Sequence, residues 1–493
     1  MSAIKRKKVL QKQSPKLNPE PKKNGMEILL FAIILIVVLL SSIMVLRLTN
    51  DQPLFPLGES YYNLRISQSL SSDLSLNKDP VQDTIYEPNA FHYFLGLLLI
   101  IFSEQLVSLF LPILLGILSA LLFFQILLLL KINKKRAGVT LIVLAVTPVF
   151  LILFSGLYVA GFMIFLSLLS MVLLLSKKKF WHWLGILSSI LLVLTSLTGF
   201  IIFLLVLLFI FLALKRNIYT LIISLISSAV VVLLLSFFSN YTPRLLGFHS
   251  FAFRDILSVL RAGMGFDIFL IFLFLIGFVI IWSRSKETKL FHLVTVVFIV
   301  LSLFNSNARI FTSFAVCVYG MITITYFFKR KWALDVIKTG TVLLVLCSLV
   351  FSATNQISQL VSAQPDKTFH DSLNFLSGLE QNNVLTSETN GFLVEFYAHK
   401  RVLLDENSFL SKDYLVIQNV TAALFEAARL KEAEPLIQEH GIRYVLITPE
   451  MKEDLWEGKE QGLWFLVKHS DRFTKRYDWN DIEIWEYKRV GEI

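Results

Sequence analysis

The chain has 493 residues, of which 55% are hydrophobic and only 17% are charged, and its mean hydropathy is +0.67. A soluble domain of this length cannot hide that much apolar side chain, so the composition excludes an ordinary soluble protein. Much of the net charge of +10 lies in residues 1–25, which carry eight basic residues and one acid. This tail has no interleaved aromatic rings, so we expect a disordered cytoplasmic segment beside anionic lipid headgroups and no nucleic-acid partner.

Apolar runs of about 20 residues recur along the chain and predict membrane-spanning helices. The basic tail precedes the first run and places the amino terminus inside the cell. The run 91–102 is only about a dozen residues long, so we expect it to lie at the outer interface without spanning. With that choice every later basic cluster falls inside. About eleven spans are then predicted: 26–45, 106–130, 139–154, 159–175, 183–197, 200–214, 218–238, 266–282, 290–304, 310–328 and 334–351.

The composition turns polar after residue 354 and predicts a soluble domain outside the cell. Strands are expected at 383–387, 401–404 and 441–447, a helix at 424–440, and a hairpin of 473–477 with 482–487. Thr448 and Pro449 are typical of a helix start. The predicted fold is an α-helical polytopic membrane protein with a C-terminal extracytoplasmic α/β domain. Its parts are the tail 1–25, the membrane domain 26–354 with an outer loop 48–104, and the soluble domain 355–493.

The outer loop contains the most informative stretch, residues 58–65 (Gly-Glu-Ser-Tyr-Tyr-Asn-Leu-Arg). On a helix, the three-to-four spacing places Glu59, Tyr62 and Arg65 on one side, with Tyr61 on a neighbouring face. An acid at a membrane interface is costly unless it is used or paired. This segment therefore predicts either a functional site or a structural ion pair between Glu59 and Arg65.

Residues 58–65 resemble the acid-plus-Tyr-Tyr-x-x-Arg segment of the GT-C superfamily of membrane glycosyltransferases. Residues 86–93 (Tyr-Glu-Pro-Asn-Ala-Phe-His-Tyr) resemble that family's proline-led interfacial helix, and Thr147-Pro148 with Ser155 resembles the end of its third span. In the soluble domain, 390–392 and 442–447 look like the outer domains of archaeal members. The resemblance implies a helical bundle and a polyprenyl-phosphate sugar donor, with a lipid, glycan or protein acceptor.

The resemblance also implies roles for individual residues. Glu59 would be the catalytic base, Tyr61 and Tyr62 would shape the sugar site, and Arg65 would bind the donor phosphate. Glu59 and Asp79 would be the candidate ligands if a divalent metal, Mg²⁺ or Mn²⁺, takes part. Two departures matter: the next outer loop, 155–158, carries no acid, and the Trp-Trp-Asp-Tyr-Gly signature of the oligosaccharyltransferase subunit is absent. Protein N-glycosylation and a metal shared by two loops are therefore not expected.

Several further side chains have both a functional and a structural interpretation. Arg309 either binds a donor phosphate or reaches the headgroups. His92 is either a substrate-binding residue or a hydrogen-bonded structural histidine. The remaining candidates either have a functional role or belong to a solvated loop or a lipid anchor. They are Asp83, Glu87, Arg244, His249, Arg254 and Arg261.

The sequence favours a multi-pass cell-envelope membrane glycosyltransferase of the hexosyltransferase type. A second hypothesis is a catalytically inactive relative that binds or scaffolds lipid-linked glycans. A transporter is a weaker third, because few charges lie in the middle of the predicted spans.

Overall fold

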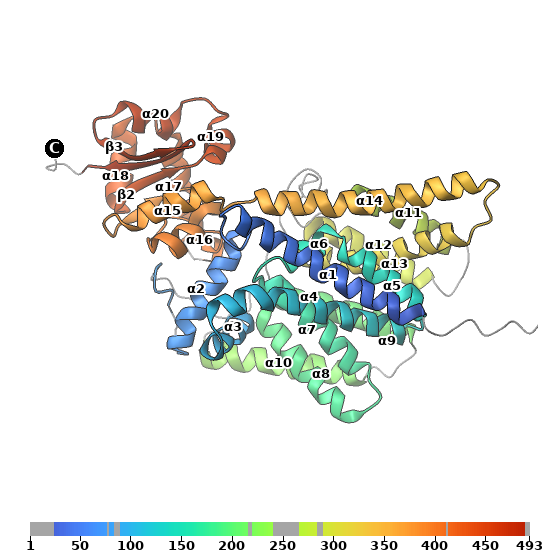
Figure 1. Ribbon diagram of the computed structural model, residues 1–493. Helices are drawn as coiled ribbons and strands as arrows, with labels where there is room; N and C mark the ends of the chain where they lie inside the picture. The colour runs from blue at the N-terminus through green and yellow to red at the C-terminus, as the bar shows by residue number, and fades with distance from the viewer. Residues whose placement is uncertain are drawn as a thin grey trace, which may run out of the picture.

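We describe a computed structural model of the protein that covers residues 24–75, 78–82, 89–214, 219–239, 266–282, 289–410 and 413–488. Long helices pack side by side into a bundle, and a small domain built on a sheet sits at one end of it (Figure 1). The bundle helices are α1 (Asn24–Thr49), α4 (Glu104–Leu129), α5 (Lys134–Ala145), α6 (Pro148–Leu153), α7 (Val159–Leu174), α8 (Lys179–Thr195), α9 (Leu197–Ala213), α10 (Tyr219–Ser239), α11 (Ile268–Trp282), α12 (Lys289–Phe304), α13 (Ser306–Lys329) and α14 (Asp335–Ser362).

Within the described residues, four helical stretches are long and apolar enough to cross a membrane: 25–49, 104–129, 306–329 and 335–377. Seven shorter apolar helices accompany them. The predicted helical runs therefore reappear close to their expected positions.

One predicted span was wrong in detail. The run 139–154 is not continuous, because α5 ends at Ala145 and α6 begins at Pro148. Thr147 caps the new helix by accepting a hydrogen bond from the Phe150 amide at 3.3 Å. Proline lacks an amide proton and favours the first turn of a helix, so the chain restarts there.

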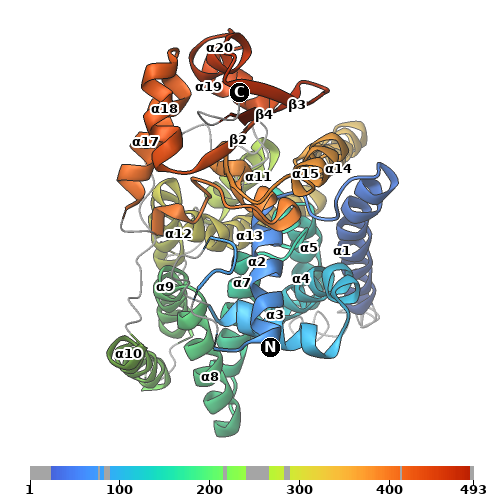
Figure 2. The same ribbon diagram turned by 90° about the vertical axis from the view of Figure 1, so that its left-hand side faces the viewer.

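Two helices of the predicted outer loop lie across the end of the bundle that carries the sheet domain (Figure 2). They are α2 (Gly58–Ser72) and α3 (Ala90–Ile101). Gly96 lets them cross closely, because a Cβ there would stand 3.2 Å from the Ser67 carbonyl oxygen. The run 91–102 is thus a helix, as predicted, and it packs on α2.

Arg47, at the end of α1, joins the first and last bundle helices. Its side chain is fully buried and donates to the carbonyls of Leu360, Val361 and Ala363 at 2.8–3.2 Å. It also donates to the carbonyls of Pro365 at 2.6 Å and Pro53 at 2.8 Å. These bonds satisfy carbonyls that the end of α14 leaves without helical partners.

The sheet domain has four strands in the order β1-β2-β4-β3. β1 (Asn383–Leu385) runs parallel to β2 (Ile442–Ile447), while β4 (Ile482–Tyr487) is antiparallel to both β2 and β3 (Phe473–Trp479). The helices of the domain are α15 (Lys367–Ser377), α16 (Gly391–Leu393), α17 (Tyr414–Glu426), α18 (Leu430–Glu439), α19 (Pro449–Trp456) and α20 (Gly462–His469).

Most of the predicted elements of this domain are confirmed. The hairpin turns at Asn480 and Asp481, whose φ angles of 47° and 62° suit a tight two-residue connection. Thr448 caps α19, which begins with Pro449 as predicted. Two predictions were wrong: 401–404 forms only a single bridge, from Val402 to Val384, and 424–440 is broken into α17 and α18.

The sheet domain contacts α2 through α16 and the following π-helical turn η3 (Val394–Ala398). A Cβ on Gly58 would stand 3.5 Å from Cβ of Phe392, so the first turn of α2 lies directly against the domain. The acid-bearing segment is therefore enclosed between bundle and domain.

Candidate functional site

Glu59 lies in the first turn of α2 and faces the start of α7. The amide of Val159, the first residue of α7, donates to Glu59 Oε1 at 3.3 Å. Tyr158, at the cap position, provides no side-chain cap, so Glu59 takes that place. A carboxylate at a helix amino terminus is stabilised by the helix dipole. Desolvation nevertheless raises the pKa of Glu59 above its ordinary value, against the hydrogen bonds from Val159 and Asn63.

The second outer loop, which carries no acid, holds this turn of α2 with its backbone. The Leu157 amide donates to Ser60 Oγ at 3.1 Å, and Asn63 Nδ2 donates to the Leu157 carbonyl at 2.8 Å. Gly156 permits the approach, because a Cβ there would collide with Ser60 Oγ. The loop thus contacts α2 through the amide and the carbonyl of Leu157.

His92, a predicted substrate-binding residue, is 2% exposed and hydrogen bonded inside the protein. Its Nε2 lies 2.7 Å from Asn63 Oδ1. Burial lowers the pKa of His92 to about 3, so the ring is neutral at physiological pH. A buried and hydrogen-bonded ring favours the structural interpretation of His92 over a substrate-binding role.

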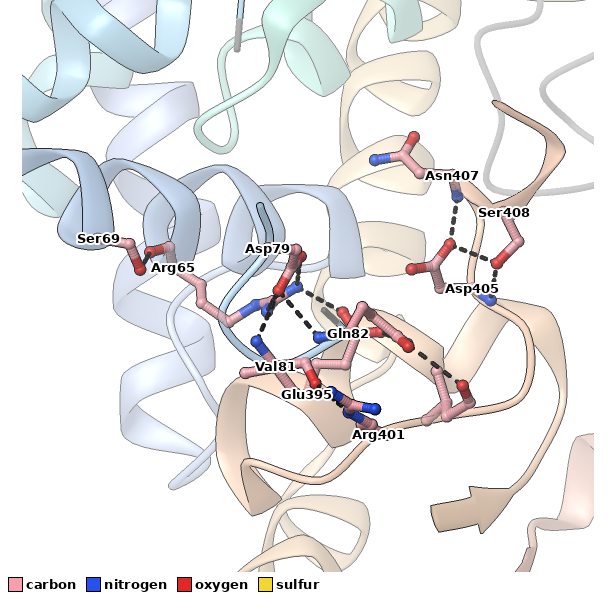
Figure 3. A network of polar contacts seen from close by, with 11 residues as sticks. Arg65, Ser69, Asp79, Val81, Gln82, Glu395, Arg401, Asp405, Asn407 and Ser408 are labelled. Atoms are coloured by element: carbon pink, nitrogen blue, oxygen red, sulfur yellow. Dashed lines mark hydrogen bonds and ion pairs between the residues drawn. The ribbon is translucent and has the colours of Figure 1, made fainter. Parts of the chain in front are cut away.

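Arg65 and Asp79, both predicted site residues, form a buried cluster with Glu395 of the sheet domain (Figure 3). Arg65 grips both oxygens of Asp79 at 2.6 and 2.9 Å and reaches Glu395 Oε2 at 2.6 Å. Gln82 donates to the other oxygen of Glu395, and Arg401 donates to the Val81 carbonyl at 2.9 Å. Arg65 thus pairs with two other carboxylates, and the structural alternative of an ion pair between Glu59 and Arg65 is not what the structure shows.

The sequence analysis missed Glu395. Burial raises the pKa of Glu395 well above its ordinary value, and the positive charge of Arg65 acts in the opposite direction. The available signal was a single acid inside the apolar segment 391–398, since a lone acid among buried residues needs a partner.

The two tyrosines face different neighbours. Tyr61 exchanges hydrogen bonds with the backbone of Phe55 at 3.0 and 3.2 Å and packs against Tyr397. Tyr62 stacks on Phe392 of the sheet domain, with ring centroids 4.5 Å apart. The Arg65 guanidinium lies 5.7 Å from the Tyr62 ring, which confirms that these two side chains share a face of α2.

Further acids approach Glu59 from the sheet domain. Glu406 keeps contact with solvent, yet desolvation and the charges of Glu59, Glu388 and Asp405 raise its pKa to about 7. Asp405 is fixed beside Gly391, where a Cβ would stand 2.8 Å from it. Glu406 was not predicted from the sequence, because only the fold brings it near Glu59.

Among the residues that the structure describes, no three His, Cys, Asp or Glu side chains gather in a way that would hold a metal ion. The described residues therefore do not fit the predicted metal, and we derive no step through one. Arg309 lies in the first turn of α13 and donates to the Ser302 carbonyl at 3.3 Å. Asp83, Glu87, Arg244, His249, Arg254 and Arg261 lie outside the described residues.

No protein-family model matches the sequence. A search of curated proteins finds no match either. Solved structures do match. The archaeal oligosaccharyltransferase AglB from Archaeoglobus fulgidus, in complex with an inhibitory peptide and a dolichol-phosphate, is 14% identical over 95% of this chain and 74% of its own, with a TM-score of 0.62.

Two further solved structures also match this chain. ArnT from Cupriavidus metallidurans bound to undecaprenyl phosphate is 11% identical over 92% of this chain and 97% of its own, with a TM-score of 0.53. The Archaeoglobus fulgidus oligosaccharyltransferase in complex with Zn and sulfate is 14% identical over 93% of this chain and 73% of its own, with a TM-score of 0.58. Identities this low establish the fold alone. The chain has the fold of the GT-C membrane glycosyltransferases.

Proposed function

We propose that the protein is a membrane glycosyltransferase that moves a sugar from a polyprenyl-phosphate donor to an acceptor outside the cell. The observation that supports this most is the setting of Glu59, an acid held at the start of α7 and enclosed by the sheet domain. Related structures were solved with dolichol-phosphate and with undecaprenyl phosphate, which supports the same class of donor.

In this proposal Glu59 is the general base. It accepts the acceptor's proton while the acceptor atom bonds to C1 of the sugar, and the bond from C1 to the phosphate oxygen breaks. A desolvated carboxylate with a raised pKa is a stronger base near neutral pH than a solvated one. The Val159 amide holds one of its oxygens in place.

The other predicted site residues take different roles. We propose that Tyr62 and its stacking partner Phe392 form a wall beside the sugar. Arg65 already bridges Asp79 and Glu395, so we propose that it holds the sheet domain against α2. Arg309 then remains the candidate that binds the donor phosphate. Tyr61 supports the turn before α2 through its bonds to Phe55.

We also propose the topology of about eleven spans, with the tail 1–25 inside the cell. The membrane domain 26–354 then places α2, α3 and the soluble domain 355–493 outside. The protein accordingly belongs to the cell envelope, where it would meet a lipid, glycan or protein acceptor.

A paired transfer assay tests the function. Purified protein and its Glu59→Gln variant are incubated with radiolabelled dolichyl- and undecaprenyl-phosphate hexoses and crude membrane acceptors, with and without EDTA. We expect turnover by the parent and a loss of at least about 100-fold in the variant, because the base is removed. The EDTA arm decides whether a metal takes part.

Glu104→Gln is the matched control, since Glu104 is an exposed acid at the start of α4 whose carboxylate accepts a hydrogen bond from Gln68. It should transfer sugar like the parent. Full activity in Glu59→Gln contradicts the proposed base. Absence of turnover in the parent, with equal binding of the lipid donors by parent and variant, supports the lipid-glycan binding scaffold instead.

A further inference from the structure

A buried polar pair, Asn63 and His92, lies next to Glu59 and has no part in the proposed chemistry. Asn63 is 1% exposed and stands one helical turn after Glu59 on α2, while His92 is 2% exposed on α3. Buried polar groups are expensive unless their hydrogen bonds are satisfied. The contacts of this pair therefore indicate what it does.

The amide of Asn63 is fully used and has one orientation. Its Nδ2 donates to the Leu157 carbonyl at 2.8 Å, and Asn63 also stabilises the charged form of the Glu59 carboxylate. The bond to Leu157 requires the NH₂ group on that side, so Oδ1 must face His92 Nε2 at 2.7 Å. Asn63 thus connects Glu59, the second outer loop and α3.

The orientation of Asn63 fixes the tautomer of His92. Because Oδ1 can only accept, Nε2 carries the proton and Nδ1 is left with a lone pair. That lone pair faces the Asn89 amide at 3.5 Å, within the capping box of α3. The position of the imidazole ring is therefore set by the start of α3.

We propose that His92 and Asn63 are positioning residues that hold Glu59 in the orientation required for proton transfer. The chain of contacts runs from the α3 cap through His92 to Asn63. Asn63 stands one turn after Glu59 and stabilises its charged form, and the carboxylate also accepts from the Val159 amide. Residues that orient the ligands of metal sites change activity by about 10- to 100-fold, and we expect an effect of the same order here. The kinetic part of the proposal rests on the proposed function, whereas its structural part does not.

Two variants of His92 separate positioning from packing. His92→Phe keeps a ring of similar size and removes the bond to Asn63, while His92→Gln places an amide donor near the former position of Nε2. Ser67→Ala is the matched control, because Ser67 lies one turn after Asn63 on α2, is fully buried, and has a hydroxyl without a hydrogen-bond partner in the described part of the chain.

The first readout needs no enzyme activity. Hydrogen exchange of full-length protein in detergent, resolved to single amides, compares Val159, which bonds to Glu59, with Leu157, which bonds to Ser60. We expect His92→Phe to speed exchange at Val159 at least about tenfold and to change Leu157 much less, because the Leu157 amide keeps its acceptor, Ser60 Oγ. Equal protection of Val159 in parent and variant overturns the proposal.

The second readout is transfer in the assay described above. We expect His92→Phe to lower kcat by about 100-fold with little change in the KM for the lipid donor. His92→Gln should return to within about tenfold of the parent, and Ser67→Ala should match it. If His92→Gln is as impaired as His92→Phe at equal thermal stability, the pair only packs and the proposal fails.

The two readouts separate this proposal from the proposed function. If the parent transfers no sugar, the proposed function fails and the exchange result alone decides whether Asn63 and His92 hold Glu59. If the parent is active and exchange at Val159 does not change, only the positioning role fails.

Discussion

Individual carboxyl groups in the site differ in how strongly the fold holds them. Glu59 has a backbone donor and Glu395 has an arginine, whereas Glu406 lies near the negative charges of Glu59, Glu388 and Asp405. Like charges that lie close together favour the protonated form of at least one of them. The pKa of Glu406 is accordingly raised to about 7, so its charge changes near neutral pH.

The raised pKa of Glu406 predicts that stability depends on pH. Its pKa rises from an ordinary 4.5 to about 7 in the folded protein, so between these values the folded state binds more protons than the unfolded state. Stability from this group is therefore lost as pH rises from about 5 to 7 and beyond. We expect the Tm of the parent to fall over that range more steeply than that of Glu406→Gln. Parallel Tm profiles would contradict the prediction.

At the scale of elements, the apolar runs predicted most helices because a helix in lipid must satisfy its own backbone. The break before Pro148 was missed because the run stayed apolar through it. Part of the site was predicted from local pattern: Glu59, Tyr62 and Arg65 follow from helical spacing on α2. Asp79 and His92 were named as candidates from the outer loop, but their partners were not predicted. Asn63, Glu395 and Glu406 were missed because their roles come from contacts between segments far apart in the chain.

The cluster around Arg65 joins α2 to the sheet domain and predicts unequal effects of two variants. Arg65→Leu leaves two buried carboxylates without their cation, which costs about 3–5 kcal/mol when a buried pair is broken. Glu395→Gln removes only a charge that burial already disfavours, so it should destabilise the protein much less than Arg65→Leu. Limited proteolysis between α14 and α15 should be faster in Arg65→Leu. Equal cleavage rates would show that the cluster does not hold the domain.

Gly156 allows the second outer loop to reach α2, so Gly156→Ala should weaken that contact. The added Cβ collides with Ser60, and overpacking of this kind costs about 1–3 kcal/mol. Gly340→Ala is the control, since a Cβ there meets nothing within 4 Å and alanine favours the interior of α14. Thermal unfolding should show a lower Tm for the first variant only. An unchanged Tm for Gly156→Ala would mean that the loop moves freely.

For the whole molecule, the sidedness of the membrane domain decides whether the site faces the outside. Cysteines are placed at Asp471 in the sheet domain and at Lys178 between α7 and α8, both exposed, after replacement of Cys317 and Cys347 by serine. A membrane-impermeant maleimide added to intact cells should label Asp471→Cys, and Lys178→Cys only after permeabilisation. The reverse pattern would invert the proposed topology.

The burial of Arg47 also has a consequence for biogenesis. Four of the five carbonyls that surround its guanidinium belong to residues 360–365, more than 300 positions later in the chain. A ribosome delivers the amino-terminal helix first, so α1 enters the membrane long before α14 exists. Until then the arginine must remain among water and lipid headgroups. The end of the bundle beside the sheet domain is therefore completed last, when α14 packs against α1 and the sheet domain that follows it can cover α2.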